Sequence, residues 1–283
     1  MSGYKTFAVA GAGTLGKFII SELLKEKAAG KIDKVVVLTR SADNSFGDAE
    51  ALVVDYSSPE FLQSALKGVE VLVCTLGTTA LAFQEPLAEA AKAAGVKLFI
   101  PSDFAGYPVG KSEGLYPIKN SYRDMLDRVG LPWTTFATGP FGDWIFYEPM
   151  FGYDLKNGTA EVGGTGDGLV SFTARPDIAR FVAHILTTVP ASELPRKIFQ
   201  MEGERISVNG VITGYEKATG KKIDVTRVPM DVVHANLAKG DFKAFLQFVF
   251  ETAGTTGPAE DMNVDWPDFH PMSVVESLLA NKD

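Results

Sequence analysis

Three glycines near the start of the chain have the spacing of a phosphate-binding loop. They stand at positions 11, 13 and 16, between the apolar run Thr6–Ala10 and the helical pattern Leu15–Lys27. The first permits a tight turn, the second lets a pyrophosphate approach the backbone, and the third lets a helix pack on the strand. Amides at the start of that helix bind phosphate oxygens. The pattern alone could be a glycine-rich turn, but its place between a strand and a helix predicts dinucleotide binding. The residues expected to bind are Gly11, Gly13, Thr14, Leu15 and Gly16.

The residues after the second apolar run bear on which dinucleotide is bound. Arg40 and Ser41 follow Lys34–Thr39, where NAD enzymes carry an acid for the ribose 2′-hydroxyl and NADP enzymes an arginine. Arg40 offers a planar fork of donors to a 2′-phosphate, and Ser41 adds a hydroxyl; a solvated surface charge is the alternative for Arg40. Asp43 and Asp55 are nearby acids that would favour NAD, but one lies inside the loop and the other ends the following strand. The sequence favours NADP(H).

The fourth apolar run ends at the edge where a parallel sheet binds its ligands. Cys74 is followed there by Thr75, Leu76 and Gly77, three further candidates for cofactor contact. The absence of a side chain at Gly77 lets the backbone approach a ligand. Cys74 itself is interpreted as an inert buried thiol, the common state of a cysteine inside a strand.

Two lysines, Lys111 and Lys119, are candidates for a catalytic acid or base. Ordinary short-chain dehydrogenases use a Tyr-x-x-x-Lys pair on one helix, and Tyr107 and Lys111 have that spacing. Pro108 and Gly110 lie between them, however, and both residue types disfavour a continuous helix that would carry the pair. We therefore interpret this match as accidental and turn to Lys119.

Lys119 lies close to the start of an expected helix. Pro117 suits the first position of that helix, and Lys119 then shares a face with Tyr122 and Arg123 through i, i+3 and i+4 spacing. The helix dipole disfavours a cation at this end, and partial burial adds to that cost, so both effects lower the pKa of Lys119 toward a useful proton donor or acceptor. A solvated surface lysine is the alternative. Lys119 is the catalytic candidate, with Tyr122 beside it as a candidate substrate contact.

The elements that must position these residues alternate along the first half of the chain. Short runs that are apolar on both faces alternate with helical patterns, as in a parallel sheet covered by helices on both sides. The expected strands are Thr6–Ala10, Lys34–Thr39, Leu52–Val54, Val71–Thr75, Lys97–Ile100 and Trp133–Ala137. The expected helices are Leu15–Lys27, Pro59–Leu66, Phe83–Ala94 and Pro117–Val129. We expect an α/β protein in which residues 1–140 form a doubly wound parallel sheet of the Rossmann type.

The pattern changes after Pro140. Residues 141–283 are expected to form a smaller, mixed α/β substrate lobe, with some segments interleaved with the first domain. Its expected helices and strands are Asp177–Thr188, Ser207–Thr219, Asp231–Lys239, Asp241–Glu251, Lys197–Met201 and Ile223–Arg227. An aromatic-rich stretch opens this half at Phe141–Tyr153 and suits a flat apolar ligand, although packing between lobes is the alternative. Trp144 and Tyr147 are its candidate substrate contacts.

Bulk properties exclude several classes of function. The formal net charge of −8 argues against nucleic acid or an anionic membrane as the main partner. The single cysteine forms no internal disulfide, and the first residues lack the features of a signal peptide. No run approaches about 18 consecutive apolar residues. The three histidines are too scattered for a metal site. We expect a soluble cytoplasmic protein, a monomer or homodimer, that binds no metal.

Several segments together resemble the isoflavone reductase-like, NmrA-like group of atypical short-chain dehydrogenases. The resemblance covers nearly the whole chain, and the ordered set of segments is more specific than the glycine loop alone. Its segments are Gly11–Gly16, Thr39–Ser41, Gln84, Ala94–Phe104, Lys119 to Arg123, Gly130–Thr134, Gly139–Phe141, Asp177–Arg180 and Pro271–Leu279. The group has a Rossmann domain, a small C-terminal substrate lobe and a preference for NADPH.

The resemblance implies roles for individual residues. Lys119 matches the lysine proposed as general acid/base in the reductases of this group, and Gln84 and Ser102 join the expected cofactor site. The segment Gly139, Pro140 and Phe141 would line the nicotinamide and substrate cleft, and Phe104 would contact substrate. The implied function is an NADPH-dependent reductase acting on a small aromatic or conjugated substrate. The alternatives are an NmrA-like dinucleotide sensor without catalysis and a non-redox isomerase or lyase.

Overall fold

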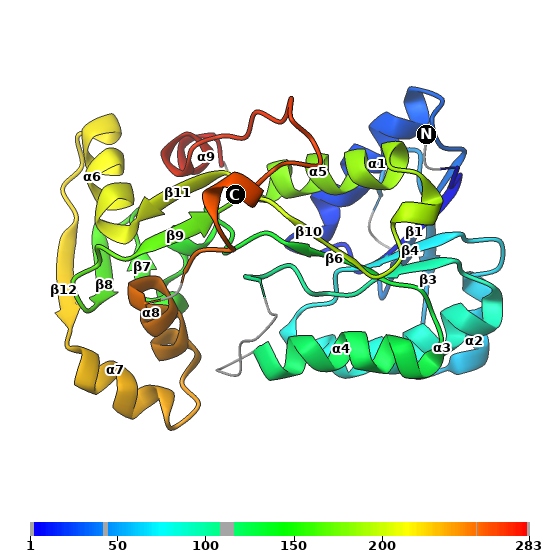
Figure 1. The fold of residues 1–283 in the computed structure, drawn as a ribbon, viewed down its shortest axis with the longest axis horizontal. Coiled ribbons are helices and arrows are strands. Elements are labelled where there is room, and N and C mark those ends of the chain that lie inside the picture. Colours follow the sequence, from blue (N-terminus) through cyan, green and yellow to red (C-terminus); the bar gives the residue numbers. More distant parts are fainter. Residues whose placement is uncertain (1–2, 42–44, 108–115, 253, 282–283) are drawn as a thin grey trace. The chain divides into compact units, whose positions relative to one another are not determined.

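The computed structural model describes residues 3–41, 45–107, 116–252 and 254–281 (Figure 1). The chain divides into two compact units, each assembled from three separate segments. Unit 1 contains Met1–Asp103, Ile118–Phe136 and Ile178–Phe199, and unit 2 contains Phe104–Pro117, Ala137–Asp177 and Gln200–Asp283. No described helix combines the length and the apolar character needed to cross a membrane.

Unit 1 is built on a parallel sheet of five strands in the order β3-β2-β1-β4-β5. Its strands are β1 Thr6–Ala10, β2 Lys34–Thr39, β3 Glu50–Val53, β4 Val71–Cys74 and β5 Leu98–Ile100. The strand order reverses direction between β1 and β4, which is the switch point where doubly wound sheets bind ligands at their carboxyl edge. The expected α/β fold with a Rossmann-type sheet is therefore confirmed.

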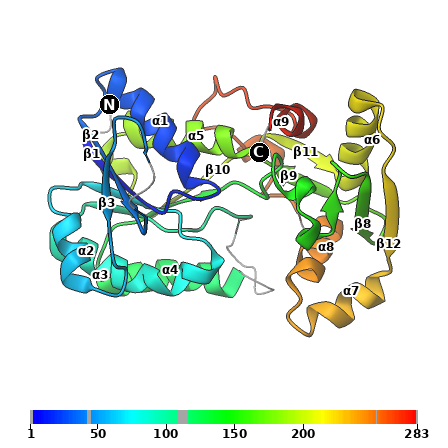
Figure 2. The ribbon, with the colours of Figure 1, turned by 180° about the vertical axis from the view of Figure 1, so that it is seen from behind.

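Helices cover both faces of this sheet. They are α1 Gly16–Ala28, α2 Pro59–Ala65, α3 Gln84–Ala94, α4 Tyr116–Val129 and α5 Arg175–Thr188. Helices α1 and α5 lie on one face, and α2, α3 and α4 lie on the other (Figure 1, Figure 2). A 3₁₀ helix, Thr78–Phe83, precedes α3, so that helix begins one residue later than expected. Ser58 is the residue before α2, and its side chain makes no capping hydrogen bond.

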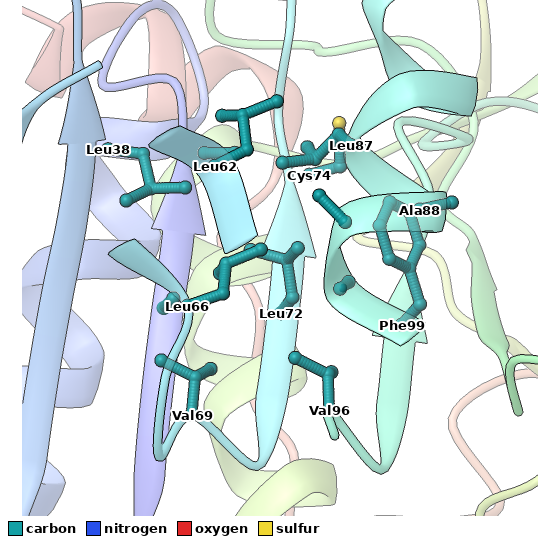
Figure 3. Packing of buried hydrophobic residues seen from close by; sticks show 14 of the residues in the cluster. Leu38, Leu62, Leu66, Val69, Leu72, Cys74, Leu87, Ala88, Val96 and Phe99 are labelled. Atoms are coloured by element: carbon teal, nitrogen blue, oxygen red, sulfur yellow. The ribbon is translucent and has the colours of Figure 1, made fainter. Parts of the chain in front are cut away.

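Alternate residues of the strands form the hydrophobic core beneath α2 and α3. Leu38, Leu72 and Cys74 point to this face of the sheet, where they meet Leu62 of α2 and Leu87 of α3 (Figure 3). All five of these side chains are buried. Burying a leucine side chain contributes about 1.5–3 kcal/mol relative to leaving it exposed, so the core fixes the strands whose ends carry the site.

The segment Trp133–Ala137 departs from the expected arrangement. Within the described residues, it is joined to the parallel sheet by a single bridge, from Phe99 to Trp133. The strand itself, β6 Thr134–Ala137, pairs instead with β10 Lys197–Gln200. Pro101 follows β5 directly and lacks the N–H that would extend the ladder, which explains why the parallel pairing stops so early.

The described part of unit 2 contains one mixed sheet, one antiparallel pair of strands and four further α-helices. Strands β12, β8 and β7 form one sheet, with β12 parallel and β7 antiparallel to β8, and β11 pairs with β9 in antiparallel fashion. The strands are β7 Tyr153–Asp154, β8 Thr159–Gly163, β9 Leu169–Phe172, β11 Glu204–Ser207 and β12 Asp224–Val228. The helices are α6 Val208–Thr219, α7 Met230–Leu237, α8 Phe242–Thr252 and α9 Val274–Ala280. Aromatic rings fill its core, with Phe146 against Tyr153 and Phe172 against Phe250.

Candidate functional site

The glycine loop joins β1 to α1 at the carboxyl edge of the sheet. Gly11 has a φ of +95°, and a Cβ atom there would lie 3.1 Å from the carbonyl oxygen of Thr75. A Cβ atom at Gly16 would lie only 2.0 Å from the carbonyl oxygen of Gly11. Position 11 therefore needs a residue that adopts the left-handed backbone conformation. Position 16 needs a residue without a side chain, so that α1 can pack on the loop. The fold itself accounts for both glycines.

Gly13 is different, because the fold does not account for it. It is exposed, its φ is not positive, and a Cβ atom there would have no described atom within 4 Å. Thr14 is also exposed, whereas Leu15 is buried. Helix α1 has no side-chain cap and no acid in its first turn. The open backbone at Gly13 and the uncompensated positive end of the helix dipole fit a pyrophosphate.

The end of β4 is hydrogen-bonded to this loop and to the end of β5. Thr75 Oγ1 donates to the carbonyl oxygen of Gly11 at 2.6 Å. Ser102 Oγ donates to the carbonyl oxygen of Leu76 at 2.9 Å. Gly77 is exposed, and a Cβ atom there would meet no described atom within 4 Å. The candidate residues from the ends of three strands are thus joined at one edge.

Gln84 holds the loop after β5 from the start of α3. Its side chain is buried, and its Oε1 accepts a hydrogen bond from the Ser102 amide at 2.8 Å. Its Nε2 and the hydroxyl of Tyr122 are both buried, and neither makes a well-formed hydrogen bond to a described residue. A weaker contact between Gln84 and Tyr122 lowers the pKa of Tyr122 against the larger effect of burial. Gln84 therefore joins the loop after β5 to Tyr122 of α4.

Lys119 continues this hydrogen-bonded path. Its Nζ donates to the carbonyl oxygen of Ser102 at 2.6 Å and lies 5.9 Å from the centroid of the Tyr122 ring. Burial lowers the pKa of Lys119, while Asp103 and Cys74 oppose that shift. Cys74 is a buried free thiol whose pKa is raised to about 12, chiefly by burial. The side chain is thus half-buried with its amine held by the Ser102 carbonyl, in line with the partial burial expected from the sequence.

The candidates for 2′-phosphate recognition stand at the end of β2. Arg40 is exposed, and the Ser41 amide donates to Thr39 Oγ1 at 3.2 Å. Asp55, one of the acids that would favour NAD, accepts hydrogen bonds from the amide and hydroxyl of Ser57 at 2.9 and 2.6 Å. Those bonds lower the pKa of Asp55 and engage one of its oxygens within its own turn. Asp43 lies outside the described residues, as does Lys111 of the Tyr107 pair.

The remaining predicted cofactor contacts belong to unit 2. Gly139 has a φ of +66°, and a Cβ atom there would lie 1.7 Å from the carbonyl oxygen of Ser171, so glycine is required. The carbonyl oxygen of Pro140 accepts a hydrogen bond from the Thr173 amide at 3.1 Å, and Phe141 forms a bridge with the same residue. The segment is thereby fixed against the start of α5 and the end of β9.

The predicted substrate contacts Phe104, Trp144 and Tyr147 are all half-buried residues of unit 2. The Trp144 ring packs edge-on against Phe151, with centroids 5.2 Å apart. The Tyr147 hydroxyl donates to the carbonyl oxygen of Leu278 at 2.9 Å, which ties it to α9. Trp144 and Tyr147 therefore have packing roles in unit 2, and the polar end of Tyr147 is already engaged.

Asp103 entered the sequence analysis only as part of the segment Ala94–Phe104, with a supporting role in the loop after β5. It is buried beside Arg123, whose Nη1 lies 3.4 Å from its Oδ2. Burial raises the pKa of Asp103 to about 6, against the opposing effect of Lys119 and Arg123. The available signal was an acid three residues after the end of β5, on the edge where Lys119 was expected. Its burial is what the sequence does not display.

Comparison with known proteins agrees with this geometry. The model of the NmrA-like family matches residues 4–268. The isoflavone reductase homologue IRL of Zea mays is 30% identical over 257 residues, which cover 81% of this chain and 79% of that protein. A phenylcoumaran benzylic ether reductase of Populus trichocarpa is 26% identical over 82% of this chain and 81% of its own length.

Solved structures resemble the chain over almost its whole length. The ternary complex of leucoanthocyanidin reductase from Vitis vinifera has a TM-score of 0.80 at 20% identity, covering 97% of this chain and 98% of that one. The NADPH complex of a quinone oxidoreductase from Escherichia coli has a TM-score of 0.79 at 20% identity, covering 98% and 100%. At such identities the likeness concerns the fold.

Proposed function

Because the chain belongs to the NmrA-like family, we propose that it is an NADPH-dependent reductase that acts on a small aromatic or conjugated substrate, with Lys119 as its general acid or base. The first half of the proposal, binding of NADP(H), is supported by the open Gly13 backbone at the α1 terminus and by Arg40 at the end of β2. It is further supported by the related folds whose structures hold NADPH.

The observation that carries the proposal is the hydrogen-bonded path along the carboxyl edge of unit 1. Thr75 bonds to the glycine loop, Ser102 bonds to Leu76, and Lys119 bonds to Ser102. The path links a withdrawn amine to the loop whose backbone suits a pyrophosphate. A lysine that served only solubility would gain nothing from such a place.

The division of labour follows from this arrangement. NADPH, when bound, supplies the hydride from C4 of its nicotinamide. Lys119 holds a proton on Nζ, and the carbonyl of Ser102 orients that ammonium group. Burial lowers the pKa of Lys119 and so makes its proton easier to transfer to a developing oxyanion or carbanion. Gln84 accepts a hydrogen bond from the amide of Ser102 and so helps to fix the residue whose carbonyl holds Lys119.

The substrate class is proposed from the relatives. They include a phenylcoumaran benzylic ether reductase, several isoflavone reductase homologues and a related structure solved with NADP⁺ and pinoresinol. The compounds in these names are all small and aromatic. The contacts predicted from the sequence on the substrate side, Phe104, Tyr122, Trp144 and Tyr147, stay predictions.

Turnover provides the direct test. The purified protein is mixed with NADPH and with aromatic enones, quinones or benzylic ethers, and loss of NADPH absorbance is followed against a sample without substrate. We expect oxidation with at least one of these classes, with a reduced product identified by mass spectrometry. Tight NADPH binding with no oxidation across the panel would replace the reductase by a dinucleotide sensor.

The coenzyme preference gives a separate prediction. Wild-type protein should bind NADPH about 10- to 100-fold more tightly than NADH, because a charge-assisted hydrogen bond contributes about 1.5–3 kcal/mol. Arg40→Asp should remove or invert this preference in fluorescence titrations with both coenzymes. Arg128→Asp is the matched control, since it makes the same change of charge at another exposed arginine, in the last turn of α4, that pairs with Glu85. Equal affinities of the wild type for the two coenzymes would contradict the assignment of Arg40.

A further inference from the structure

The buried carboxyl of Asp103 is the chemically unexplained group nearest the candidate site. Its side chain is only 2% exposed, and that of its partner Arg123 is 12% exposed. The Arg123 guanidinium also lies 5.9 Å from the centroid of the Trp133 ring. The contact between Arg123 Nη1 and Asp103 Oδ2 is long, at 3.4 Å, and Asp103 Oδ1 is buried with no hydrogen-bond partner among the described residues.

Such a pair is a poor device for stabilising a fold. A carboxylate removed from water is compensated only when its oxygens are well hydrogen-bonded, and one oxygen of Asp103 is not. A buried polar atom left without a partner often belongs to a functional arrangement. The cause of the placement of Asp103 is therefore to be sought in its neighbours.

Lys119 is the neighbour whose protonated form the carboxylate of Asp103 stabilises. Its amine bonds to the carbonyl oxygen of Ser102, which belongs to the peptide bond that links Ser102 to Asp103. The negative charge of Asp103 raises the pKa of Lys119 against the effect of burial. Cys74 and Tyr122 also face this group, but the pKa of each is raised to about 12, mainly by burial, so both are neutral near pH 7.

Resting on the role proposed above for Lys119, we propose that Asp103 is its positioning residue: the buried carboxylate, held by Arg123, retains the ammonium form of Lys119 and aligns it on the carbonyl of Ser102. Without this charge, burial alone favours release of the proton. A neutral amine has no proton to give to the product. Burial makes the proton of Lys119 easier to transfer, but without the carboxylate it would also leave Lys119 unprotonated and unable to act as an acid.

The test reads the protonation of Lys119 directly, without coenzyme or substrate. Wild type and Asp103→Asn are labelled with trace acetic anhydride over a range of pH, and peptide mass spectrometry gives the labelling profile of each lysine. We expect the Lys119 profile to move to lower pH by about 1–2 pH units in Asp103→Asn, the range for loss of one nearby opposite charge. Exposed lysines in the same sample serve as internal references.

Two matched variants sharpen the result. Asp124→Asn removes an exposed acid from α4, the helix that carries Lys119, and should leave the Lys119 profile unchanged. Asp103→Glu keeps the charge and should restore most of the wild-type profile. A folded Asp103→Asn protein with an unshifted Lys119 profile overturns the proposal.

A second measurement covers the case in which Asp103→Asn does not fold. In Lys119→Gln, the carboxyl ¹³C resonance of Asp103 should titrate at higher pH than in wild type, because the cation that favours the carboxylate has gone. An unchanged titration overturns the proposal by this route. Neither experiment depends on turnover, so an enzyme that oxidises no NADPH would refute the reductase while leaving the coupling between Asp103 and Lys119 measurable.

Discussion

Replacement of Lys119 by alanine is expected to lower kcat by about 10²–10⁴, the usual contribution of a general acid or base. The affinity for NADPH should change much less, because the pyrophosphate and 2′-phosphate contacts proposed above involve other residues. Lys119→Arg should not restore the rate, since a guanidinium hardly releases a proton near neutral pH. Steady-state kinetics with the substrate found in the panel, together with a coenzyme titration, separate the two effects.

The chain offers a matched control for this substitution. Lys92 of α3 also donates from Nζ to a backbone carbonyl, that of Gly130, but it is exposed. Lys92→Ala removes a similar lysine-to-carbonyl bond from unit 1 and should leave kcat near the wild-type value. If Lys119→Ala turned over as fast as Lys92→Ala, the ammonium group of Lys119 would have no part in proton transfer.

Gly13→Val is expected to weaken NADPH binding at least about 100-fold, equivalent to about 2.7 kcal/mol, while the protein stays folded. The backbone at Gly13 has an ordinary φ and open space where the side chain would go, so the valine meets no described atom of the protein. It would instead occupy the position proposed for the pyrophosphate. Coenzyme titration measures the loss, and circular dichroism with thermal melting measures the fold.

Gly16→Ala is expected to differ from Gly13→Val in that it lowers the stability of the fold as well as coenzyme binding. Its Cβ atom would collide with the carbonyl oxygen of Gly11, so the melting temperature should fall together with binding. Normal NADPH affinity in a folded Gly13→Val protein would mean that the pyrophosphate does not lie on this loop.

The parallel sheet and its helices were predictable because their sequence signals are local. The strands β1 and β2 each contain four consecutive apolar residues, and both have the predicted bounds. The loop between β1 and α1 was equally readable, since Gly11 and Gly16 are required by a turn and by close packing that recur wherever a strand meets a helix in this way.

Unit 2 was less predictable, for reasons of packing. Strand β8, Thr159–Gly163, begins inside a stretch rich in glycine, and its apolar alternation is limited to Ala160 and Val162. A Cβ atom at Gly163 would lie 2.6 Å from the Cβ of Gln247 in α8. Glycine is therefore required here by packing against a residue that is distant in sequence. Sequence periodicity does not contain such a contact.

The same limit applies to the candidate site. The position of Lys119 near a helix start was visible, but its bond to Ser102 depends on a loop 17 residues earlier in the chain. The burial of Asp103 arises only when β5, α3 and α4 have assembled. The sequence shows that an aspartate is present at position 103, but it does not show that the carboxyl group is buried away from water.

The interleaving of the two units has a consequence for biosynthesis. Unit 1 takes its last segment from Ile178–Phe199, after the whole of the first two segments of unit 2 has been translated. A nascent chain that ends before residue 178 therefore lacks β10 and most of α5, so β6 has an unpaired edge and one face of the sheet is only partly covered. An exposed strand edge is prone to pairing with other chains. The ribosome must release nearly 200 residues before the nucleotide-binding half can close, and neither half can be expressed alone as one uninterrupted fragment.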